Sequence, residues 1–519
     1  MSRSSIEPLL QPIPAARQED ARHYGVHPYF TRRPANVVRE YLKRYSRKND
    51  VVLDPFGGTG VTAIEAFLLG RNGIQNDLNP FANFIARNIA DTSLPSTGPL
   101  QEAFAKVKDE CLETIGLIEQ SESKAEHLLK ELPLPKNIPL PKTSDADFFY
   151  DMFSPRQMAG IALIKKAIDA HSRGSVRDSL LLAWSASIAK LNKTFLSAKG
   201  RAESRGGSSI FSIYRYKLAS ECVELPIWET FEGRFSNVLA AKKEVLQIRD
   251  YHKRQGSELD SRKHFKVLSE DAAKLDKVLR PGSVDYIFTD PPYGGFITYL
   301  DLSILWNHWL GFSVSEETRQ SEIIVGGQCD HSEDHYKTSL RRSIEASLHL
   351  LKPDRWFSIV FQHWDISYFA TILETADECG AQLKAAITQT GDVIWSMHKK
   401  KNSESVIAGE MIITFYKPAS ARRQKVKNET TTEPDDPTKV LDEVFDSCLR
   451  NGIETFTSEA LFNRLIMELW RRRSLGCLNL DRDEFVSRLK DRGWTYSSDN
   501  HAWTTGELAK ATTGQIGLL

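Results

Sequence analysis

A glycine-rich turn that joins an apolar run to a helical segment constrains the fold of this chain more than any other feature. Residues 51–53 are apolar and predict a short strand, and residues 61–69 predict a helix after the turn. A second strand over residues 72–77 and a second helix over residues 80–88 follow. Strands that alternate with helices in this way form parallel sheets with right-handed crossovers. The sequence therefore predicts an α/β fold built on a Rossmann-like sheet.

The strand-and-helix rhythm returns after a long interruption. Apolar runs at residues 265–268, 284–288 and 356–361 predict further strands, the last of them after a Lys-Pro turn, and runs near 380–388 and 409–416 would complete the sheet. Composition and periodicity divide the chain into six predicted parts, which are a polar lead-in (1–26), a first core part (27–92), a large, mainly helical insert (93–262), a second core part (263–417), a charged linker (418–438) and a small C-terminal helical module (439–519).

The C-terminal module has a pattern of its own. Its sequence predicts three amphipathic helices, at about 439–450, 457–473 and 482–492, and then an aromatic hairpin over 494–503. Three helices followed by a small hairpin suggest a winged-helix-like module.

Net charge does not identify a partner, because Lys+Arg and Asp+Glu both total 68. Any face that binds nucleic acid must come from local clusters of basic residues. No apolar run is long enough to predict a transmembrane helix, and residues 1–20 lack the apolar core of a signal peptide. The six cysteines form no C-x-x-C pair, and His331 and His335 have no third ligand nearby. We therefore expect a cytoplasmic protein without a metal site or a membrane segment.

The glycine-rich turn is expected to bind a ligand, and taken alone it could serve a nucleotide, a flavin or a methyl donor. Gly57, Gly58 and Gly60 allow the backbone to turn tightly and to approach a bound molecule closely. The turn is not a P-loop, and its spacing differs from the G-x-G-x-x-G of dinucleotide-binding folds. Asp77 ends the next strand, 19 residues after Gly58, where a carboxylate can accept both hydroxyls of a ribose. Asp54 would lie near the amino-acid end of a methyl donor, where a carboxylate suits an ammonium group.

A second motif, Asp290-Pro291-Pro292-Tyr293, follows the apolar strand near residues 284–288. The nitrogen of an exocyclic amine is a poor nucleophile because its lone pair is conjugated with the ring. A carboxylate on Asp290 and a carbonyl on Pro291 could accept the two N–H groups and direct the lone pair at a methyl group. Two proline rings stiffen this segment, and Tyr293 offers a face on which a flipped base can stack.

The two motifs together resemble those of the DNA amino-methyltransferases, the adenine-N6 and cytosine-N4 class, with their F-x-G-x-G and (D/N/S)-P-P-(Y/F) loops. The resemblance implies a class I methyltransferase sheet and S-adenosyl-L-methionine as the cofactor. Residues 27–42 are similar to the family's segment before the cofactor loop, and residues 290–310 and 359–365 are similar to a large-insert, adenine-type branch. The resemblance and the turn chemistry together assign the following residues to the donor site: Asp54, Phe56, Gly57, Gly58, Gly60, Asp77, Asp271, Tyr29 and Thr31.

The insert is a candidate for DNA target recognition. It contains a basic stretch, rich in Gly and Ser and followed by aromatic residues, in which four cations are candidates for contact with DNA phosphates: Lys199, Arg201, Arg205 and Arg215. A solvated loop with ordinary charges explains the same pattern equally well. The basic runs at 398–401 and 471–473 are weaker candidates.

These patterns predict a DNA methyltransferase that modifies the exocyclic amine of a flipped base. Aspartate at the first position of the catalytic loop favours adenine-N6 by resemblance, and cytosine-N4 stays open. An RNA amino-methyltransferase and a non-catalytic DNA-binding homologue are the remaining alternatives. The predicted partner is DNA, together with restriction or defence proteins if the enzyme belongs to such a system.

Overall fold

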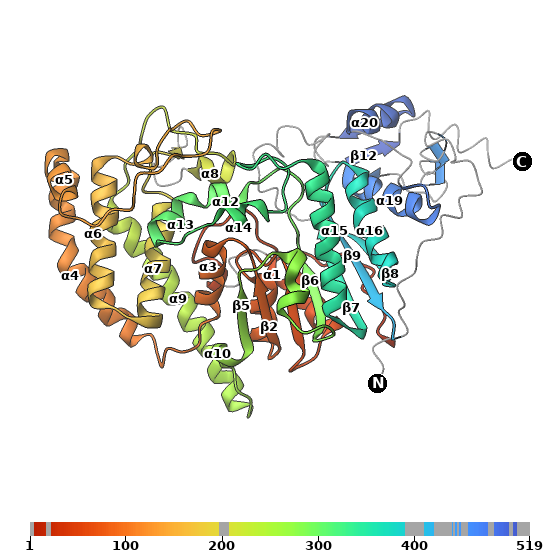
Figure 1. The fold of residues 1–519 in the computed structure, drawn as a ribbon, viewed down its shortest axis with the longest axis horizontal. Helices are drawn as coiled ribbons and strands as arrows, with labels where there is room; N and C mark the ends of the chain where they lie inside the picture. The colour runs from red at the N-terminus through yellow and green to blue at the C-terminus, as the bar shows by residue number, and fades with distance from the viewer. Residues whose placement is uncertain are drawn as a thin grey trace, which may run out of the picture. The chain divides into compact units, whose positions relative to one another are not determined.

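The computed structural model describes residues 5–16, 22–196, 207–389, 409–419, 439, 442–443, 446–447, 455–475, 482–497 and 502–505. The chain forms a mixed, mostly parallel seven-stranded sheet with many helices (Figure 1), which confirms the predicted α/β class. It divides into two compact units. The first unit comprises Ala16–Ala272 and Gly294–Glu333, and the second comprises Met1–Ala15, Ala273–Tyr293 and Asp334–Leu519.

The first unit holds the predicted glycine turn. Its three parallel strands lie in the order β5-β2-β1, and its core elements are β1 (Val51–Asp54), α2 (Val61–Leu68), β2 (Asn72–Asn76), α3 (Pro80–Ala90) and β5 (Phe265–Leu268), preceded by α1 (Ala35–Tyr45). The predicted strand–turn–helix–strand–helix order is confirmed. Gly60 adopts a φ of 88°, which a residue with a side chain rarely adopts, and α2 begins directly after it. The helix α3 begins at Pro80, and the side chain of Asn79 accepts the N–H of Phe81 at its start.

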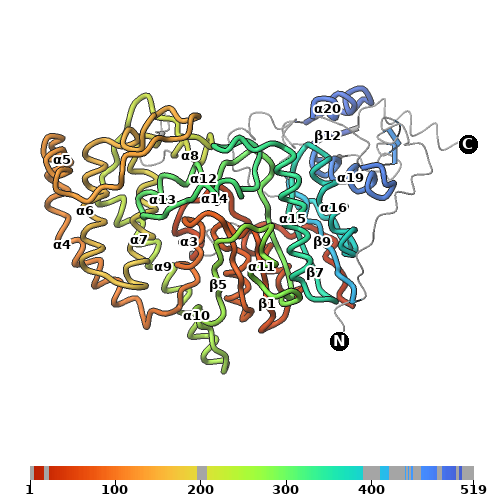
Figure 2. Tube along the Cα trace, in the orientation of Figure 1, coloured from red at the N-terminus to blue at the C-terminus, as the bar shows by residue number. Residues whose placement is uncertain are grey.

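The insert is mainly helical, as predicted, and belongs to the same unit. Its elements are α4 (Gly98–Gln120), α5 (Glu122–Leu129), α6 (Pro155–His171), α7 (Gly174–Ile188), β3 (Phe195–Leu196), β4 (Gly207–Ser208), α8 (Ser209–Ser212), α9 (Ile227–Arg254) and α10 (Ser261–His264). The helices α4, α6, α7 and α9 pack in that order, each against the next, as the chain trace shows (Figure 2). The helix α9 also packs against α2 and α3.

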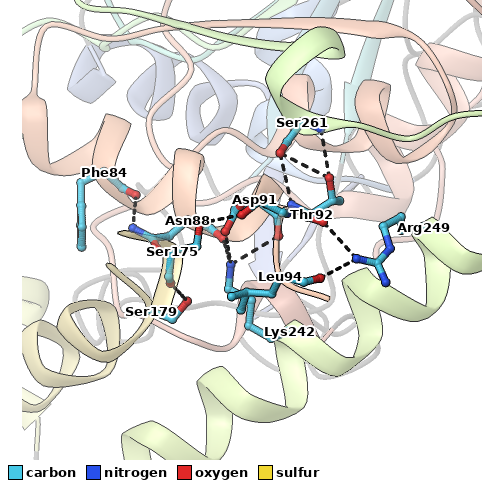
Figure 3. A network of polar contacts seen from close by, with 11 residues as sticks. Phe84, Asn88, Asp91, Thr92, Leu94, Ser175, Ser179, Lys242, Arg249 and Ser261 are labelled. Atoms are coloured by element: carbon cyan, nitrogen blue, oxygen red, sulfur yellow. Dashed lines mark hydrogen bonds and ion pairs between the residues drawn. The ribbon is translucent and has the colours of Figure 1, made fainter. Parts of the chain in front are cut away.

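A network of polar contacts fixes α9 to the end of α3 (Figure 3). Lys242 is 2% exposed, and its ammonium donates to the carbonyl of Asn88 at 2.6 Å, with Asp91 Oδ2 at 3.5 Å. Arg249 donates to the carbonyl of Thr92 at 3.1 Å. The last carbonyls of a helix have no partner within the helix and carry partial negative charge, so a cation stabilises them. Burial lowers the pKa of Lys242, an effect that the nearby Asp91 opposes. The insert is therefore anchored to the core by a buried lysine.

Three short helices after residues 290–293 also belong to the first unit, namely α12 (Tyr299–Leu302), α13 (Ile304–Leu310) and α14 (Glu316–Gln320). Trp306 of α13 stacks on Phe81 of α3, with ring centroids 4.9 Å apart and planes 2° from parallel. The side chain of Asn79 donates to Ser303 Oγ at 2.7 Å. These contacts bring residues from the second half of the sequence against the helix that follows β2.

The second unit holds the predicted catalytic motif. Its strands lie in the order β6-β7-β9-β8, and its elements are α11 (Leu275–Val278), β6 (Val284–Thr289), α15 (Glu333–Leu350), β7 (Leu351–Phe361), α16 (Ile366–Glu378), β8 (Gln382–Gln389) and β9 (Glu410–Lys417). The strands β6 and β7 are parallel, whereas β9 is antiparallel to both β7 and β8. The two late strands predicted from the sequence are confirmed.

One strand begins earlier than predicted. We expected a Lys-Pro turn before the strand at 356–361, whereas β7 starts at Leu351 and includes Lys352 and Pro353. The register with β6 shifts between Val284 and Tyr286, so residues 352–355 bulge out opposite Asp285. A bulge accommodates a proline, which has no N–H to give to the ladder. Asp285 accepts from Lys352 at 2.7 Å and from Arg355 at 3.0 Å, which holds the bulge in place.

The C-terminal module contains α19 (Ser458–Arg471), α20 (Arg482–Asp491) and a three-stranded sheet of β10 (Thr455–Phe456), β12 (Ala502–Thr505) and β11 (Trp494–Ser497). Two of the three predicted helices and the aromatic hairpin are confirmed. The first predicted helix, at about 439–450, falls mostly outside the described residues, as does the linker. None of the helices in the described part of the chain has both the length and the apolar character needed to cross a membrane.

Candidate active site

The glycine turn is a compact hydrogen-bonded loop at the carboxyl end of β1. The N–H of Gly57 donates to the carbonyl of Asn76 at 2.9 Å, and the N–H of Gly60 donates to the carbonyl of Gly57 at 2.7 Å. Gly58 and Gly60 both have positive φ, of 53° and 88°. The turn therefore needs glycine at these two positions for its backbone conformation.

Gln75, a residue of β2, supports the turn through a hydrogen bond, a role that the sequence reasoning missed. Its side chain is fully buried within β2 and donates from Nε2 to the carbonyl of Gly58 at 2.8 Å. A Cβ atom on Gly57 would lie 1.9 Å from Oε1 of this glutamine. Gly57 is therefore required for space rather than for conformation. An amide in the middle of a buried strand is the sequence signal that could have indicated this role.

Asp77 directly follows β2 and is held by two backbone donors. The N–H of Gly58 donates to its Oδ2, and the N–H of Asn79 to its Oδ1, each at 2.8 Å. Burial raises the pKa of Asp77 to about 6, although both hydrogen bonds act in the opposite direction. Both carboxylate oxygens are thus fixed in orientation, and each retains a further lone pair that can accept a ligand hydroxyl.

The predicted acidic residues follow three neighbouring parallel strands. Asp54 ends β1 and is 4% exposed, and its Oδ1 accepts the N–H of Phe56 at 3.1 Å. Asp271 follows β5. The amide of Asn76 ties the three strand ends together, since Nδ2 donates to Pro55 at 2.9 Å and Oδ1 accepts the N–H of Glu270 at 3.0 Å. Because the carboxyl ends of parallel strands meet at one edge of a sheet, the carboxylates gather beside the glycine turn.

The segment before β1 lies against the turn. The ring of Tyr29 would be 3.6 Å from a Cβ on Gly58, and its hydroxyl accepts from Asn79 Nδ2 at 3.4 Å. Burial and the neighbouring Asp77 raise the pKa of Tyr29. Thr31 is exposed, and its hydroxyl is 3.4 Å from that of Tyr299.

Arg32 fixes this segment to the turn and was also missed. Its Nε donates to Thr59 Oγ1 at 3.2 Å, and its Nη2 donates to the carbonyl of His27 at 2.9 Å. Burial lowers the pKa of Arg32 to about 10. The guanidinium thereby joins the residues before β1 to the residue between the last two glycines of the turn.

Glu322, a buried residue of the same unit, interacts electrostatically with this part of the site. Glu322 is 8% exposed, and its Oε1 accepts the N–H of Leu300 at 3.0 Å. Burial raises the pKa of Glu322 to about 8, and Asp77 contributes to the increase. Glu322 lies more than two hundred residues after the glycine turn, so no local pattern indicated its place here.

The predicted catalytic motif, Asp290-Pro291-Pro292-Tyr293, follows β6 in the second unit. The hydroxyl of Tyr293 donates to Asp290 Oδ1 at 2.6 Å, and its ring meets Phe361 edge-on with centroids 5.2 Å apart. Tyr336, a buried residue of α15, donates from its hydroxyl to the carbonyl of Pro292 at 2.6 Å. Hydrogen bonds therefore hold the loop at the carbonyl of Pro292 and at the hydroxyl of Tyr293. Pro291 lies between Asp290 and Pro292, in the segment that the two proline rings stiffen.

The structure brings all nine predicted donor residues into the first unit and all four predicted catalytic residues into the second. Among the predicted DNA contacts, Arg215 is an exposed residue that forms an ion pair with Asp145. Lys199, Arg201 and Arg205 lie outside the described residues, as does the basic run at 398–401. The described residues contain no group of three or more His, Cys, Asp or Glu side chains suited to a metal ion.

Comparison with known proteins relates part of the chain to DNA methylases. Residues 10–128 match a family model described as DNA methylase. A stretch of 72 residues is 35% identical to the type II methyltransferase M.MjaII of Methanocaldococcus jannaschii and covers 14% of this chain and 14% of that relative. A stretch of 65 residues is 38% identical to the type II methyltransferase M1.MboII of Moraxella bovis and covers 12% of this chain and 25% of the relative.

These alignments span a quarter or less of the length of the two relatives. The family match includes β1, the glycine turn, β2 and α3, and the loop at 290–293 lies beyond it. Residues 10–128 of this chain are therefore similar to the DNA methylase family over the segment that carries the glycine turn and Asp77.

Proposed function

We propose that the chain is an S-adenosyl-L-methionine-dependent DNA methyltransferase that modifies the exocyclic amine of a base, with adenine-N6 as the first candidate. One observation carries the proposal: the Asp290-Pro291-Pro292-Tyr293 loop follows a parallel strand, in a chain whose residues 10–128 match the DNA methylase family. A carboxylate, a fixed carbonyl and an aromatic ring in this order suit the chemistry of an exocyclic amine.

The residues around the glycine turn fit the proposed cofactor. The carboxylate of Asp77, oriented by two N–H groups, can accept ribose hydroxyls, and Asp54 can bind the ammonium of the methionine part. A Cβ on Gly58 would be 3.6 Å from the Tyr29 ring, so this ring borders the space beside the glycine. Asp271 lies at the adjoining strand end, where it can accept from an adenine amino group, and Phe56, Gly57, Gly60 and Thr31 complete the proposed donor site. S-adenosyl-L-methionine supplies an electrophilic methyl group from its sulfonium.

The catalytic loop binds and orients the target amine. Asp290 and the carbonyl of Pro291 accept its two N–H groups, which directs the nitrogen lone pair out of the ring plane. The hydroxyl of Tyr293 holds the Asp290 carboxylate at 2.6 Å, so the target amine replaces or shares this donor when it binds. The Tyr293 ring supplies a stacking surface for the base.

The identity of the target base and the choice between DNA and RNA as substrate are also part of the proposal. Aspartate at position 290 favours adenine-N6 by resemblance, with cytosine-N4 as the alternative. The insert, including Lys199, Arg201, Arg205 and Arg215, is proposed to contact the target DNA, and proteins of a restriction or defence system are candidate partners. The family that residues 10–128 match is described as DNA methylase, which supports DNA over RNA as substrate.

The decisive experiment is transfer of a radiolabelled methyl group from the cofactor to unmethylated duplex DNA, followed by nucleoside analysis. We expect label in N6-methyladenine and loss of transfer by about a hundred- to a thousandfold in Asp290→Ala, with cofactor affinity retained. Label in N4-methylcytosine would change the base assignment. Label in RNA but not in DNA, or cofactor binding without any transfer, would refute the proposal in favour of an RNA enzyme or a non-catalytic homologue.

A further inference from the structure

Gln362 is a buried amide that has no hydrogen-bond partner in the described part of the chain. The residue directly follows β7 and is 8% exposed. Neither its Nε2 nor its Oε1 bonds to any of the described residues. A buried polar group without a partner is destabilising, so such a group in a folded protein calls for an explanation. A ligand that pairs with the amide would remove this cost when it binds.

The position of Gln362 connects the amide to the catalytic loop. The parallel strands β6 and β7 pair Thr289 with Ile359, so Asp290 and Gln362 both lie just beyond the carboxyl ends of neighbouring strands. Phe361, the residue before Gln362, packs against the ring of Tyr293 with centroids 5.2 Å apart. Both the loop and the amide belong to the second unit, and this placement does not depend on the donor site.

The chemistry of an amide suits one edge of the proposed target base. A glutamine side chain carries N–H donors and a carbonyl acceptor side by side, and it recognises adenine through such a pair. In adenine and cytosine the ring nitrogen next to the amine-bearing carbon is an acceptor. The same position carries a hydrogen in guanine and thymine. The amide can therefore pair with the two bases that Asp290 is proposed to bind.

We propose that Gln362 binds the Watson–Crick edge of the flipped target base, with Nε2 donating to the ring nitrogen beside the amine. This inference rests on the proposed function. Oε1 then shares an amine hydrogen with Asp290 in a three-centre hydrogen bond. Gln362 fixes the rotation of the base in its plane, while Tyr293 fixes the plane itself. Together they position the amine at the catalytic loop.

The test pairs a protein change with a change in the base. Gln362→Met keeps the length of the side chain and removes its polar atoms, and 1-deazaadenine lacks the ring nitrogen but keeps the amine. The analogue is placed in an oligonucleotide at the site that sequencing of modified bases identifies, with 3-deazacytosine used if the target is cytosine. The matched control is Gln382→Met, at an exposed position of β8 in the same unit.

We expect the wild-type protein and the Gln382→Met control to lose about 5- to 150-fold in kcat/KM on the analogue. Gln362→Met should show a loss of similar size on adenine and no further loss on the analogue, with unchanged cofactor affinity. Equal rates of the wild type on both bases would overturn the inference, even if Gln362→Met did not fold. A variant that is weaker yet still discriminates between the bases would show a purely structural amide and would also overturn it. Absence of transfer by the wild type would instead refute the proposed function.

Discussion

Replacement of Gly57 by alanine is expected to disturb the glycine turn through one identified side chain. A Cβ at this position would lie 1.9 Å from Oε1, 2.5 Å from Cδ and 2.6 Å from Nε2 of Gln75. The amide must therefore move by about 1.5 Å to reach ordinary van der Waals separation. Gln75 is fully buried, and the movement breaks its 2.8 Å bond to the carbonyl of Gly58. Gly57 does not have a positive φ, so the backbone itself accepts alanine.

The size of the effect follows from these contacts. Overpacking of a well-packed core costs about 1–3 kcal/mol, and the lost hydrogen bond adds about 1 kcal/mol. If most of this free energy destabilises the cofactor-bound form of the turn, affinity for the proposed cofactor falls by about 10- to 100-fold. Gln75→Ala loses this hydrogen bond without introducing a clash, which corresponds to about a fivefold loss of cofactor affinity. In the double variant, the new methyl group of residue 57 occupies the space that the Gln75 amide leaves.

Calorimetric titration of the wild type, Gly57→Ala, Gln75→Ala and the double variant with S-adenosyl-L-methionine forms a double-mutant cycle. We expect Gly57→Ala to be the weakest binder and the double variant to bind no worse than Gln75→Ala. Hydrogen exchange of residues 55–62 should show the same order of protection. Additive losses in the double variant would refute the argument, because they would mean that the methyl group does not meet Gln75.

Three further predictions concern other parts of the molecule. Since burial raises the pKa of Asp77 to about 6, its carboxylate takes up a proton as the pH falls, and cofactor affinity should drop about tenfold between pH 7 and pH 5. Asp77→Asn should bind the cofactor weakly at both pH values. A wild-type affinity that calorimetry finds to be independent of pH would contradict this prediction. Tyr293→Phe removes the donor to Asp290 but keeps the ring, so methyl transfer to DNA should stay within about threefold of wild type, whereas Tyr293→Ala should lose about 5- to 150-fold through lost stacking; equal activities of the two variants would argue against base stacking. Lys242→Met removes the charged donor of the Asn88 carbonyl, which keeps the N–H of Asp91 at 3.3 Å, and should destabilise the anchoring of α9 by about 1–3 kcal/mol. The measurement is faster hydrogen exchange in α3 and α9; unchanged exchange would show that packing alone anchors the insert.

The sequence predicted the elements whose causes are local. Apolar runs, glycines and the Asn79-Pro80 pair placed β1, the turn, β2 and α3 within a few residues of their observed bounds, because short-range packing and capping decide where such elements begin and end. The sequence also predicted the aromatic hairpin of the C-terminal module, because a hairpin depends on residues that are close in the chain. The bulge in β7 was not, because it depends on the pairing with Asp285 in another strand.

The contacts that shape the candidate site depend on the tertiary structure. Gln75 beneath Gly57, Arg32 on Thr59, Lys242 on Asn88 and the Tyr293 hydroxyl on Asp290 each need a geometry that residue types alone do not provide. Lys242 and Asn88, for example, lie 154 residues apart in the chain. A sequence determines which chemical groups are available and where local elements form, because those depend on neighbours along the chain. Only folding decides which distant groups become buried together, and burial is what gives a hydrogen bond or a charge its effect on the site.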